Sequence, residues 1–511
     1  MQWLNKIVDE IVKSLPSGEI LIESGGSPSG TYHLGHMREL VTADAILLEL
    51  KRRGRQAKHI YFVDDLDVFR KIPVNVPDDF DQYLGKPLCD VPSPDGKEAT
   101  SYADYFLNGL IESCKALSVD VEFVRSHPKY RSGFFVPAIE RSLERLDKVR
   151  AALETISGRK LEKEWSPIQV NEEGYLKKRP FVSLDKDAKT IRYIDKDGKE
   201  QTTSYAKGEV KLDWRLDWPA RWWLLKVHVE PYGREHASAG GSYDTGVQLM
   251  KDVYEADPPI PVPYDSINMV GDTKKMSASK GTAISALEGI EIMPTEVVRF
   301  FILRAPLERR LYFDPVNGVV QLMDEFAEIA AKTDKSKSEQ QLFDICMRDQ
   351  SQQTVSNVPF SHLVASYQAS LRDADKTLEI IERTEHKELA LGQSDIIRRE
   401  LKFIDAWLDT QAPEDIKFEL ADKVDVSKFN DKQLKFLNEL ADRVEQAPKD
   451  ADGEWYHKAI YDLKDSTGLE PKQLFQTLYQ VLIGKDSGPR AGWFLSILPR
   501  DWLLKRLRLE K

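Results

Sequence analysis

Short apolar segments alternate with helical segments over about the first 140 residues, and this alternation constrains the fold more than any other feature of the sequence. Strands are predicted in EILIE (19–23), AKHIYFV (57–63) and VDVEFV (119–124), because each is short and apolar. The helical pattern that follows the first strand stops at Gly54. Strands separated by helices form a parallel sheet with crossover connections. We therefore predict an α/β fold.

The pattern changes further along the chain. After about residue 140, a charged helical segment leads into KTIRYIDKDGKEQTTSY, which predicts a polar β-hairpin that turns at Asp197–Gly198. Strand and helix signals then return, and beyond about residue 320 the pattern is almost wholly helical. The sequence thus predicts an α/β domain with an insertion, followed by a helical domain. The predicted segments are 1–140, 141–210 (the insertion), 211–285, 286–330 (a joint) and 331–511 (helical).

The composition is that of a globular protein and argues against several classes. No apolar run approaches the ~20 residues that a membrane-spanning helix needs, and the amphipathic N-terminal segment carries acidic residues, unlike a signal peptide. The three cysteines are scattered, which argues against a disulfide framework. The net charge of −11 disfavours a general nucleic-acid coat protein, although a partner could still bind one basic face. We expect a cytoplasmic protein without membrane contact.

Two histidines stand directly after a loop of small residues, in the stretch ESGGSPSGTYHLGHMREL. Gly25, Gly26 and Ser29 lie between the first strand and the helix, where a helix N-terminus can hold an anion. His33 and His36 share one helix face, so two imidazole donors could bind a phosphate whose charge grows during a displacement. The alternative is a pair of solvent-facing histidines at a helix cap. The motif alone does not decide between them.

A second polar stretch, DTKKMSASKGTAI (272–284), combines lysines with small hydroxyl residues and a glycine. Lys275 and Lys280 could neutralise a polyphosphate as point charges. Taken alone, the stretch is better explained as a solvated charged turn. Its value lies in its combination with the two histidines.

Together these stretches resemble the paired signatures of class I aminoacyl-tRNA synthetases, His-x-Gly-His and Lys-Met-Ser-Lys-Ser, with Ala278 in place of the second lysine. Further blocks, spread from residue 23 to the C-terminal end, resemble the class I lysyl-tRNA synthetases. They include YFVDDLDVFRKIPVNVP, KLDWRLDWPARW, EPYGREHASAGGSYDTG and GPRAGWF. The resemblance implies a Rossmann-type catalytic domain with an inserted connective subdomain, followed by an all-helical C-terminal anticodon-binding domain of the helical-cage type.

The resemblance also implies an activity. ATP would activate L-lysine to lysyl-adenylate, and the lysyl group would pass to the terminal ribose of tRNA(Lys) with release of AMP and pyrophosphate. ATP would bind together with Mg²⁺, and no obligate protein partner is evident. Two alternatives stay open. Another class I enzyme of the glutamyl-like type would need cationic residues around a substrate carboxylate, and a non-catalytic tRNA-binding paralogue would need no phosphate site.

Site residues follow from the resemblance, with Glu235 where an aspartate is more usual and Asp265 where the family tends to have a glutamate. The catalytic set is His33, His36 and Lys275. The ATP set is Gly25, Gly26, Ser29, Gly35, Gly233, Glu235, Met276, Ser277, Ser279 and Lys280. The lysine set is Asp64, Asp65, Trp218, His236, Tyr264 and Asp265. The aspartates after the second strand could instead be structural caps, and Trp218 and His236 could be core residues.

No metal ligand is predicted. Many relatives carry zinc-binding cysteine pairs between the EWSP and KLDW blocks, whereas residues 165–214 contain no cysteine, so no zinc is expected and the insertion must hold together by packing, at the DKDG hairpin. The C-terminal segment PRDWLLKRLRLEK is basic. It could stack aromatic residues on unpaired anticodon bases, or it could merely close the helical domain.

Overall fold

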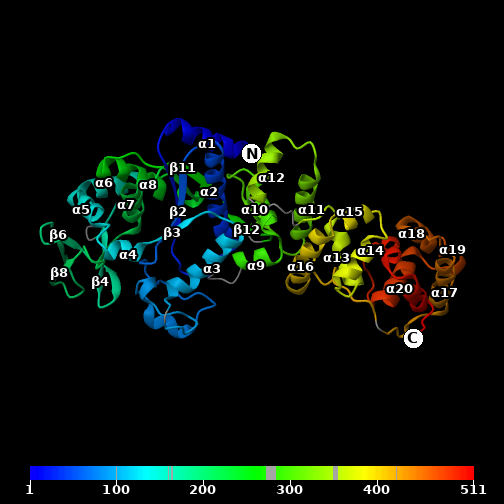
Figure 1. Ribbon diagram of the computed structural model, residues 1–511. Helices are drawn as coiled ribbons and strands as arrows, with labels where there is room; N and C mark the ends of the chain where they lie inside the picture. Colours follow the sequence, from blue (N-terminus) through cyan, green and yellow to red (C-terminus); the bar gives the residue numbers. More distant parts are fainter. Residues whose placement is uncertain are drawn as a thin grey trace. The chain divides into compact units, whose positions relative to one another are not determined.

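The computed structural model describes residues 1–98, 100–158, 160–162, 165–271, 284–348, 355–421, 423–449 and 451–510. The chain forms two compact units, coloured from blue to red along the sequence in Figure 1. The first unit comprises Met1–Ile290, Val298–Phe313 and Ser336–Arg348. The second comprises Glu291–Val297, Asp314–Lys335 and Asp349–Lys511.

A five-stranded sheet in the order β11-β10-β1-β2-β3 forms the centre of the first unit, and every neighbouring pair is parallel. Its strands are β1 (Ile20–Gly26), β2 (Ala57–Val63), β3 (Glu122–Arg125), β10 (Val229–Gly233) and β11 (Ile260–Tyr264). The strand order reverses at β1, so the sheet is of the Rossmann type and the predicted α/β fold is confirmed. Ligands bind at such a switch point, beyond the carboxyl ends of the strands.

Helices cover this sheet and connect its strands. The helix predicted to stop at Gly54 is α2 (Leu34–Arg52), and Gly54 follows it with a φ of +75°. The other helices with residues in this unit are α1 (Gln2–Ser14), α3 (Tyr102–Ala116), α4 (Ser126–Arg131), α5 (Val136–Glu144), α6 (Leu146–Ser157), α7 (Trp214–Leu225), α8 (Ser242–Leu249), α9 (Ala286–Glu291), α10 (Thr295–Leu303) and α12 (Lys337–Met347). Strands β12 (Ile267–Met269) and β13 (Leu311–Phe313) form a separate parallel pair.

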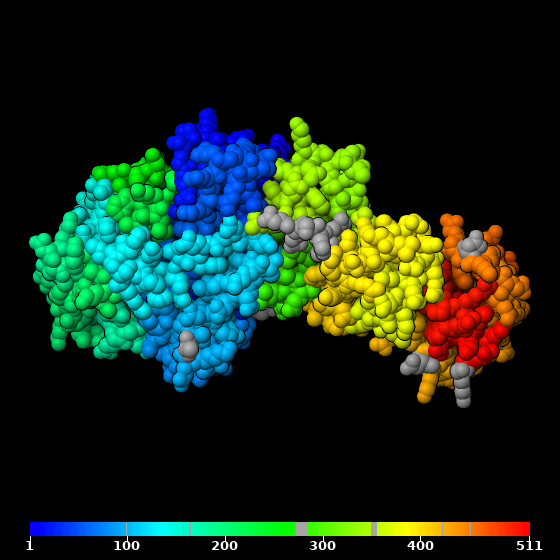
Figure 2. Space-filling view, viewed as in Figure 1, coloured from blue at the N-terminus to red at the C-terminus, as the bar shows by residue number. Residues whose placement is uncertain are grey.

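The region between β3 and α7 contains two small antiparallel sheets, in the orders β5-β4-β9 and β6-β7-β8. Their strands are β4 (Ile168–Glu172), β5 (Tyr175–Lys178), β6 (Phe181–Asp185), β7 (Thr190–Ile194), β8 (Glu200–Ser204) and β9 (Val210–Leu212). The predicted hairpin is confirmed, because β7 pairs with β8 across a turn in which Gly198 has a φ of +77°. This region forms one edge of the first unit in Figure 2, where it is coloured green-cyan.

Packing holds the insertion together, as expected, but the contacts come from the strands and not from the DKDG turn. Ile191 and Tyr193 of β7 are buried in one apolar cluster with Ile139 and Leu143 of α5. Residues 196–200 at the turn are exposed. The apolar side chains of the second small sheet thus belong to the same buried cluster as those of helix α5.

The second unit is helical in its described residues, as predicted. Its helices are α11 (Gly318–Ala331), α13 (Phe360–Ala369), α14 (Ala374–Ile381), α15 (Lys387–Gly392), α16 (Ser394–Thr410), α17 (Asp431–Glu445), α18 (Gly453–Tyr461), α19 (Lys464–Thr467), α20 (Pro471–Ile483), α21 (Ala491–Ile497) and α22 (Arg500–Leu507). Helices α18 and α21 cross closely, because a Cβ atom on Gly492 would lie 2.2 Å from the carbonyl oxygen of Gly453.

The basic C-terminal segment binds the helical unit itself. Arg500 donates to the carbonyl oxygens of Val444 and Ala447 near the end of α17, at 2.6 and 2.8 Å. Leu503 and Leu507 of α22 are fully buried. These contacts support the alternative in which the segment closes the helical domain.

We expect Ile191→Ala to destabilise the insertion by about 2–5 kcal/mol, since it leaves a cavity in the apolar cluster to which β7 and α5 both belong. Native-state hydrogen exchange of the β7 amides would measure this loss. Val182→Ala is a matched control, because Val182 lies in the same small sheet but is 39% exposed. Equal effects of the two substitutions would contradict the packing described here.

Candidate active site

A cavity of about 700 Å³ opens beyond the carboxyl ends of β1, β2 and β10 and beside the first turn of α2. It gathers residues that are far apart in the sequence. The predicted site residues that line it are Gly25, Gly26, Ser29, His33, Gly35, His36, Asp64, Trp218, Gly233, Glu235, His236 and Tyr264. The cavity therefore coincides with the switch point of the sheet, where an α/β fold binds its ligand.

The two motif histidines cap helix α2 and line the cavity at the same time. Nδ1 of His33 accepts from the Gly35 amide at 3.1 Å, and Nδ1 of His36 accepts from the His33 amide at 3.0 Å. A neutral imidazole that accepts at Nδ1 carries its proton on Nε2. Each ring is thus fixed as an Nε2–H donor at the N-terminus of a helix, which is the arrangement that an anion requires.

Glycines beside these histidines are required by close packing. A Cβ atom on Gly25 would lie 2.7 Å from the carbonyl oxygen of Phe62 in the neighbouring strand. A Cβ atom on Gly35 would lie 2.8 Å from the His33 ring. Both positions therefore keep the β1–α2 connection in the conformation that places the histidines at the cavity.

Three glutamates that sequence reasoning missed also line the cavity: Glu23, Glu39 and Glu230. Glu23 and Glu230 are only 1% and 3% exposed. Neither carboxylate oxygen of Glu23 has a hydrogen-bond partner among the described residues. Burial raises the pKa of Glu23 to about 8, and it raises the pKa of Glu230 well above its ordinary value. The signal in the sequence was an acidic residue inside an apolar strand, in LIES and in VHVEP.

Glu39 connects the first turns of α2 to β11. One of its oxygens accepts from the Gly25 amide at 2.9 Å, and the other accepts from the Tyr264 hydroxyl at 2.5 Å. Desolvation by the surrounding wall raises the pKa of Glu39 to about 7 in spite of these bonds. The sequence signal was weak, because an acid three residues after His36 is ordinary on a helix.

Aromatic rings form another part of the wall. Trp218 lies 5.5 Å from His236 and 5.8 Å from Tyr232 between ring centroids. The indole Nε1 of Trp218 donates to Glu230 at 2.7 Å. An aliphatic chain could lie along these rings while a cationic end reaches the carboxylates.

A buried ion network lies against the same wall. Lys211 is 3.2 Å from Asp64 and 3.6 Å from Asp217, and Arg221 Nε is 3.1 Å from Asp217. Lys211, Asp217 and Arg221 all come from the KLDWRLDWPARW stretch, which therefore supplies most of this network. Because Asp64 already pairs with Lys211, its charge is largely compensated within the protein.

Two predicted aspartates do not line the cavity. Asp65 accepts from Arg125 at 2.5 Å and from the His127 ring at 2.6 Å. Burial alone would raise the pKa of Asp65, but the hydrogen bonds from His127 lower it below its ordinary value. Asp265 accepts from Arg310 at 3.0 Å, and this partner likewise lowers the pKa of Asp265 against the effect of burial. Both carboxylates hold loops in place, so we leave them out of the proposed lysine pocket.

Lys275, Met276, Ser277, Ser279 and Lys280 lie outside the described residues, which stop at 271 and resume at 284. The chain resumes directly beside the histidine motif. The Leu34 amide donates to the Ile284 carbonyl at 3.2 Å, and Ser285 forms an antiparallel bridge with His33. The proposed roles of the five residues stay predictions.

Residues 1–350 match the family described as tRNA synthetases class I (K), and residues 397–509 match the anticodon binding domain. The chain belongs to the class I tRNA synthetases. A lysine--tRNA ligase from Archaeoglobus fulgidus is 36% identical over 510 residues, which is 99% of each chain. Lysine--tRNA ligase 1 from Methanosarcina acetivorans is 34% identical over 99% of this chain and 98% of its own. A glutamate-tRNA synthetase structure from Elizabethkingia anophelis aligns with 97% of this chain and all of its own, at 14% identity and a TM-score of 0.44.

The resemblance seen in the sequence is confirmed for this synthetase over nearly the whole chain. Within its described residues, we find no helix that is both long and apolar enough to span a bilayer.

Glu23→Gln should make the stability of the ligand-free synthetase fall less steeply with pH. Since folding raises the pKa of Glu23 from 4.5 to about 8, its contribution to stability is full below about pH 4.5 and is lost as pH rises through about 8. Thermal unfolding measured across this range tests the expectation. Glu122→Gln, at an exposed position of β3, is the control. A Glu23→Gln protein as pH-sensitive as the parent would contradict it.

Proposed function

We infer that this class I synthetase is a lysine--tRNA ligase, which uses ATP to activate L-lysine and then transfers the lysyl group to tRNA. The full-length similarity to lysine--tRNA ligases carries this conclusion. The cavity agrees with it, because buried carboxylates and an aromatic wall suit a substrate with an aliphatic chain and two ammonium groups. The anticodon binding domain at residues 397–509 agrees with a tRNA substrate.

The glutamyl-like alternative is disfavoured by the charge of the cavity. A substrate carboxylate would meet Glu23, Glu39 and Glu230. The lining also includes the cations Arg70, Lys71 and Arg221, but Arg221 is already paired with Asp217 and Glu23, and Arg70 with Asp67. A non-catalytic tRNA-binding protein would have no use for two capping histidines aimed at an anion site. Both alternatives thus leave the main features of the cavity unexplained.

The chemistry consists of two displacements. A lysine carboxylate oxygen attacks the α-phosphorus of ATP, bound as its magnesium complex, and the bond to pyrophosphate breaks. A ribose hydroxyl of the tRNA terminus then attacks the lysyl carbonyl, and AMP leaves. The Nε2–H groups of His33 and His36 stabilise the phosphate charge in the first step, with Lys275 as the proposed partner in the 272–283 segment. Positioning and charge stabilisation suffice, so no side chain has to act as nucleophile.

We assign the ends of the substrates to different parts of the cavity. The phosphates lie at the start of α2, with Gly25, Gly26, Ser29 and Gly35 shaping that wall. Gly233 and the exposed Glu235 at the end of β10 bind the nucleoside, with Glu235 on the ribose hydroxyls. The ammonium groups of lysine pair with the glutamates of the cavity wall, Glu23, Glu39 and Glu230. Trp218 and His236 hold its methylene groups. Asp64 acts by orienting Lys211.

The domain assignment also stays a proposal. We propose that residues 1–140 and 211–285 form the catalytic domain around the insertion, that 286–330 form a joint that contacts the tRNA stem, and that 331–511 bind the anticodon of tRNA(Lys). The family match to 1–350 and the anticodon match to 397–509 support it. We also propose that the protein is located in the cytoplasm.

His36→Ala should slow adenylate formation by about 10²-fold or more with little change in lysine affinity, because the histidine acts mainly on transition-state charge. Rapid-quench measurement of lysyl-adenylate, beside equilibrium binding of lysine, separates the two quantities. His457→Ala, at an exposed position of α18, is the control. Unchanged adenylate formation in the His36 variant would remove the proposed mechanism.

Glu23→Gln and Glu39→Gln should each weaken lysine use by about 2–5 kcal/mol, since each leaves an ammonium group unpaired in a buried site. The loss should fall on the KM for lysine and not on that for ATP, and selectivity for lysine over norleucine should decrease in at least one variant. Glu235→Gln is the control for the other substrate, because it should change the KM for ATP and leave the KM for lysine unchanged. If all three variants affect ATP and lysine alike, the assignment of the two ends is wrong.

A further inference from the structure

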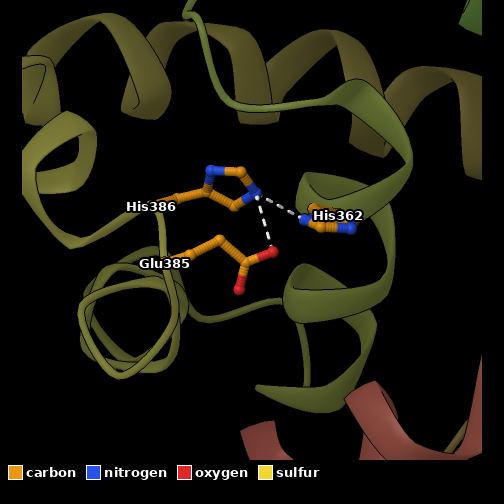
Figure 3. Close-up of side chains that lie close together, drawn as sticks. All are labelled: His362, Glu385 and His386. Carbon is orange, nitrogen blue, oxygen red and sulfur yellow. Dashed lines mark hydrogen bonds and ion pairs between the residues drawn. The ribbon is translucent and has the colours of Figure 1, made fainter. Parts of the chain in front are cut away.

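Two histidines and a glutamate come together in the helical unit, in a place that the synthetase reaction does not use. His362 lies in the first turn of α13, and Glu385 and His386 lie directly before α15 (Figure 3). Nδ1 of His362 is 2.8 Å from Nε2 of His386, which is 3.7 Å from a carboxylate oxygen of Glu385. Across the described part of the chain, this is the one group of three possible ligand residues whose atoms all lie within 4.8 Å of one another.

The imidazole pair is held in place by its neighbours. His362 is half-buried and stacks on Trp493, with ring centroids 4.8 Å apart and an interplanar angle of 22°. Burial, followed by the neighbouring His386, lowers the pKa of His362 below its ordinary value. One of the two facing nitrogens donates and the other accepts in the present hydrogen bond. If the donor ring moves its proton to its other nitrogen, two lone pairs face the same point.

That point suits a metal ion of a particular class. Zinc binds nitrogen at about 2.0–2.1 Å, so two ligands of a tetrahedral site are about 3.3 Å apart. The observed 2.8 and 3.7 Å lie on either side of that spacing. The Glu385 side chain is 69% exposed and can therefore move toward the ion. Two imidazoles and one carboxylate favour zinc-like ions over magnesium, which prefers oxygen ligands.

We propose that His362, Glu385 and His386 bind one zinc-class divalent ion, with water in the fourth position. The ion connects the start of α13 to the segment between α14 and α15, so it stabilises the helical unit. Arg490 acts against a cation here, since its charge also contributes to the lowered pKa of His362, and Glu385 acts in the opposite direction. The earlier expectation of no zinc rested on missing cysteines in residues 165–214; this site uses other ligands, elsewhere in the chain.

The test uses the full chain after treatment with a chelator. Zinc is titrated in competition with a chromogenic chelator, cobalt is added separately to record its visible absorption, and magnesium serves as the negative ion. We expect one zinc ion per chain at these residues and a rise in the unfolding temperature with zinc but not with magnesium. His386→Asn should weaken this binding by about 100-fold, and Glu385→Gln by about 10-fold. His457→Asn, which changes an exposed histidine of the same unit, should bind as the parent does.

Several outcomes would overturn the proposal. One is zinc affinity that survives His386→Asn. Another is affinity that is lost in His33→Asn and kept in His386→Asn, which would place the ion at the active site. Circular dichroism of each metal-free variant shows whether it is folded. If His386→Asn does not fold, Glu385→Gln decides, because its exposed side chain can change without disturbing the core, and undiminished affinity there excludes the three-ligand site.

Discussion

The parallel pairing of β1 with β2 on one side and with β10 on the other sets the position of the groups in the cavity. Gly26 pairs with Val63, and Ile22 pairs with Val229, so three strands end at the same level. A slip of one residue would turn Glu23 to the opposite face of the sheet and move the start of α2. The close contact of Gly25 with Phe62 explains why the pairing tolerates no side chain at that position.

Charge in the interior of the first unit is distributed unequally. Lys211 and Arg221 are balanced by Asp64 and Asp217, as buried charges in proteins generally are. Glu23 and Glu230 lie close by with fewer partners: Arg221 is 3.8 Å from Glu23, and the Trp218 indole donates to Glu230. A buried carboxyl with few partners is unfavourable in the free protein when it ionises, and the cationic substrate proposed above would reduce that cost. The interior thus separates charges that pair with one another from carboxyl groups that line the cavity.

The sequence predicted the fold well because its signals are local. The three N-terminal strands, the end of α2 at Gly54 and the hairpin at Gly198 all follow from apolar patterns and turn residues within a few positions. The histidine motif was also found locally. Asp65 and Asp265 were expected at the lysine pocket but do not line the cavity, because Arg125 and Arg310, which bind them, come from distant segments that no pattern connects to them. The glutamates were missed for the same reason, since only the sheet brings β1, α2 and β10 to one wall.

The cap on α2 has a consequence for how this catalytic centre responds to acid. His33 and His36 use Nδ1 to accept from backbone amides, so a proton on either Nδ1 would replace an acceptor with a second donor. The added positive charge would attract phosphate more strongly, but the amide would lose its partner and the helix its start. The proposed anion site and the start of α2 therefore share one proton-free atom on each ring. If phosphate binds here as proposed, it does so to uncharged imidazoles, and a further positive charge on either ring would cost a hydrogen bond at the start of the helix.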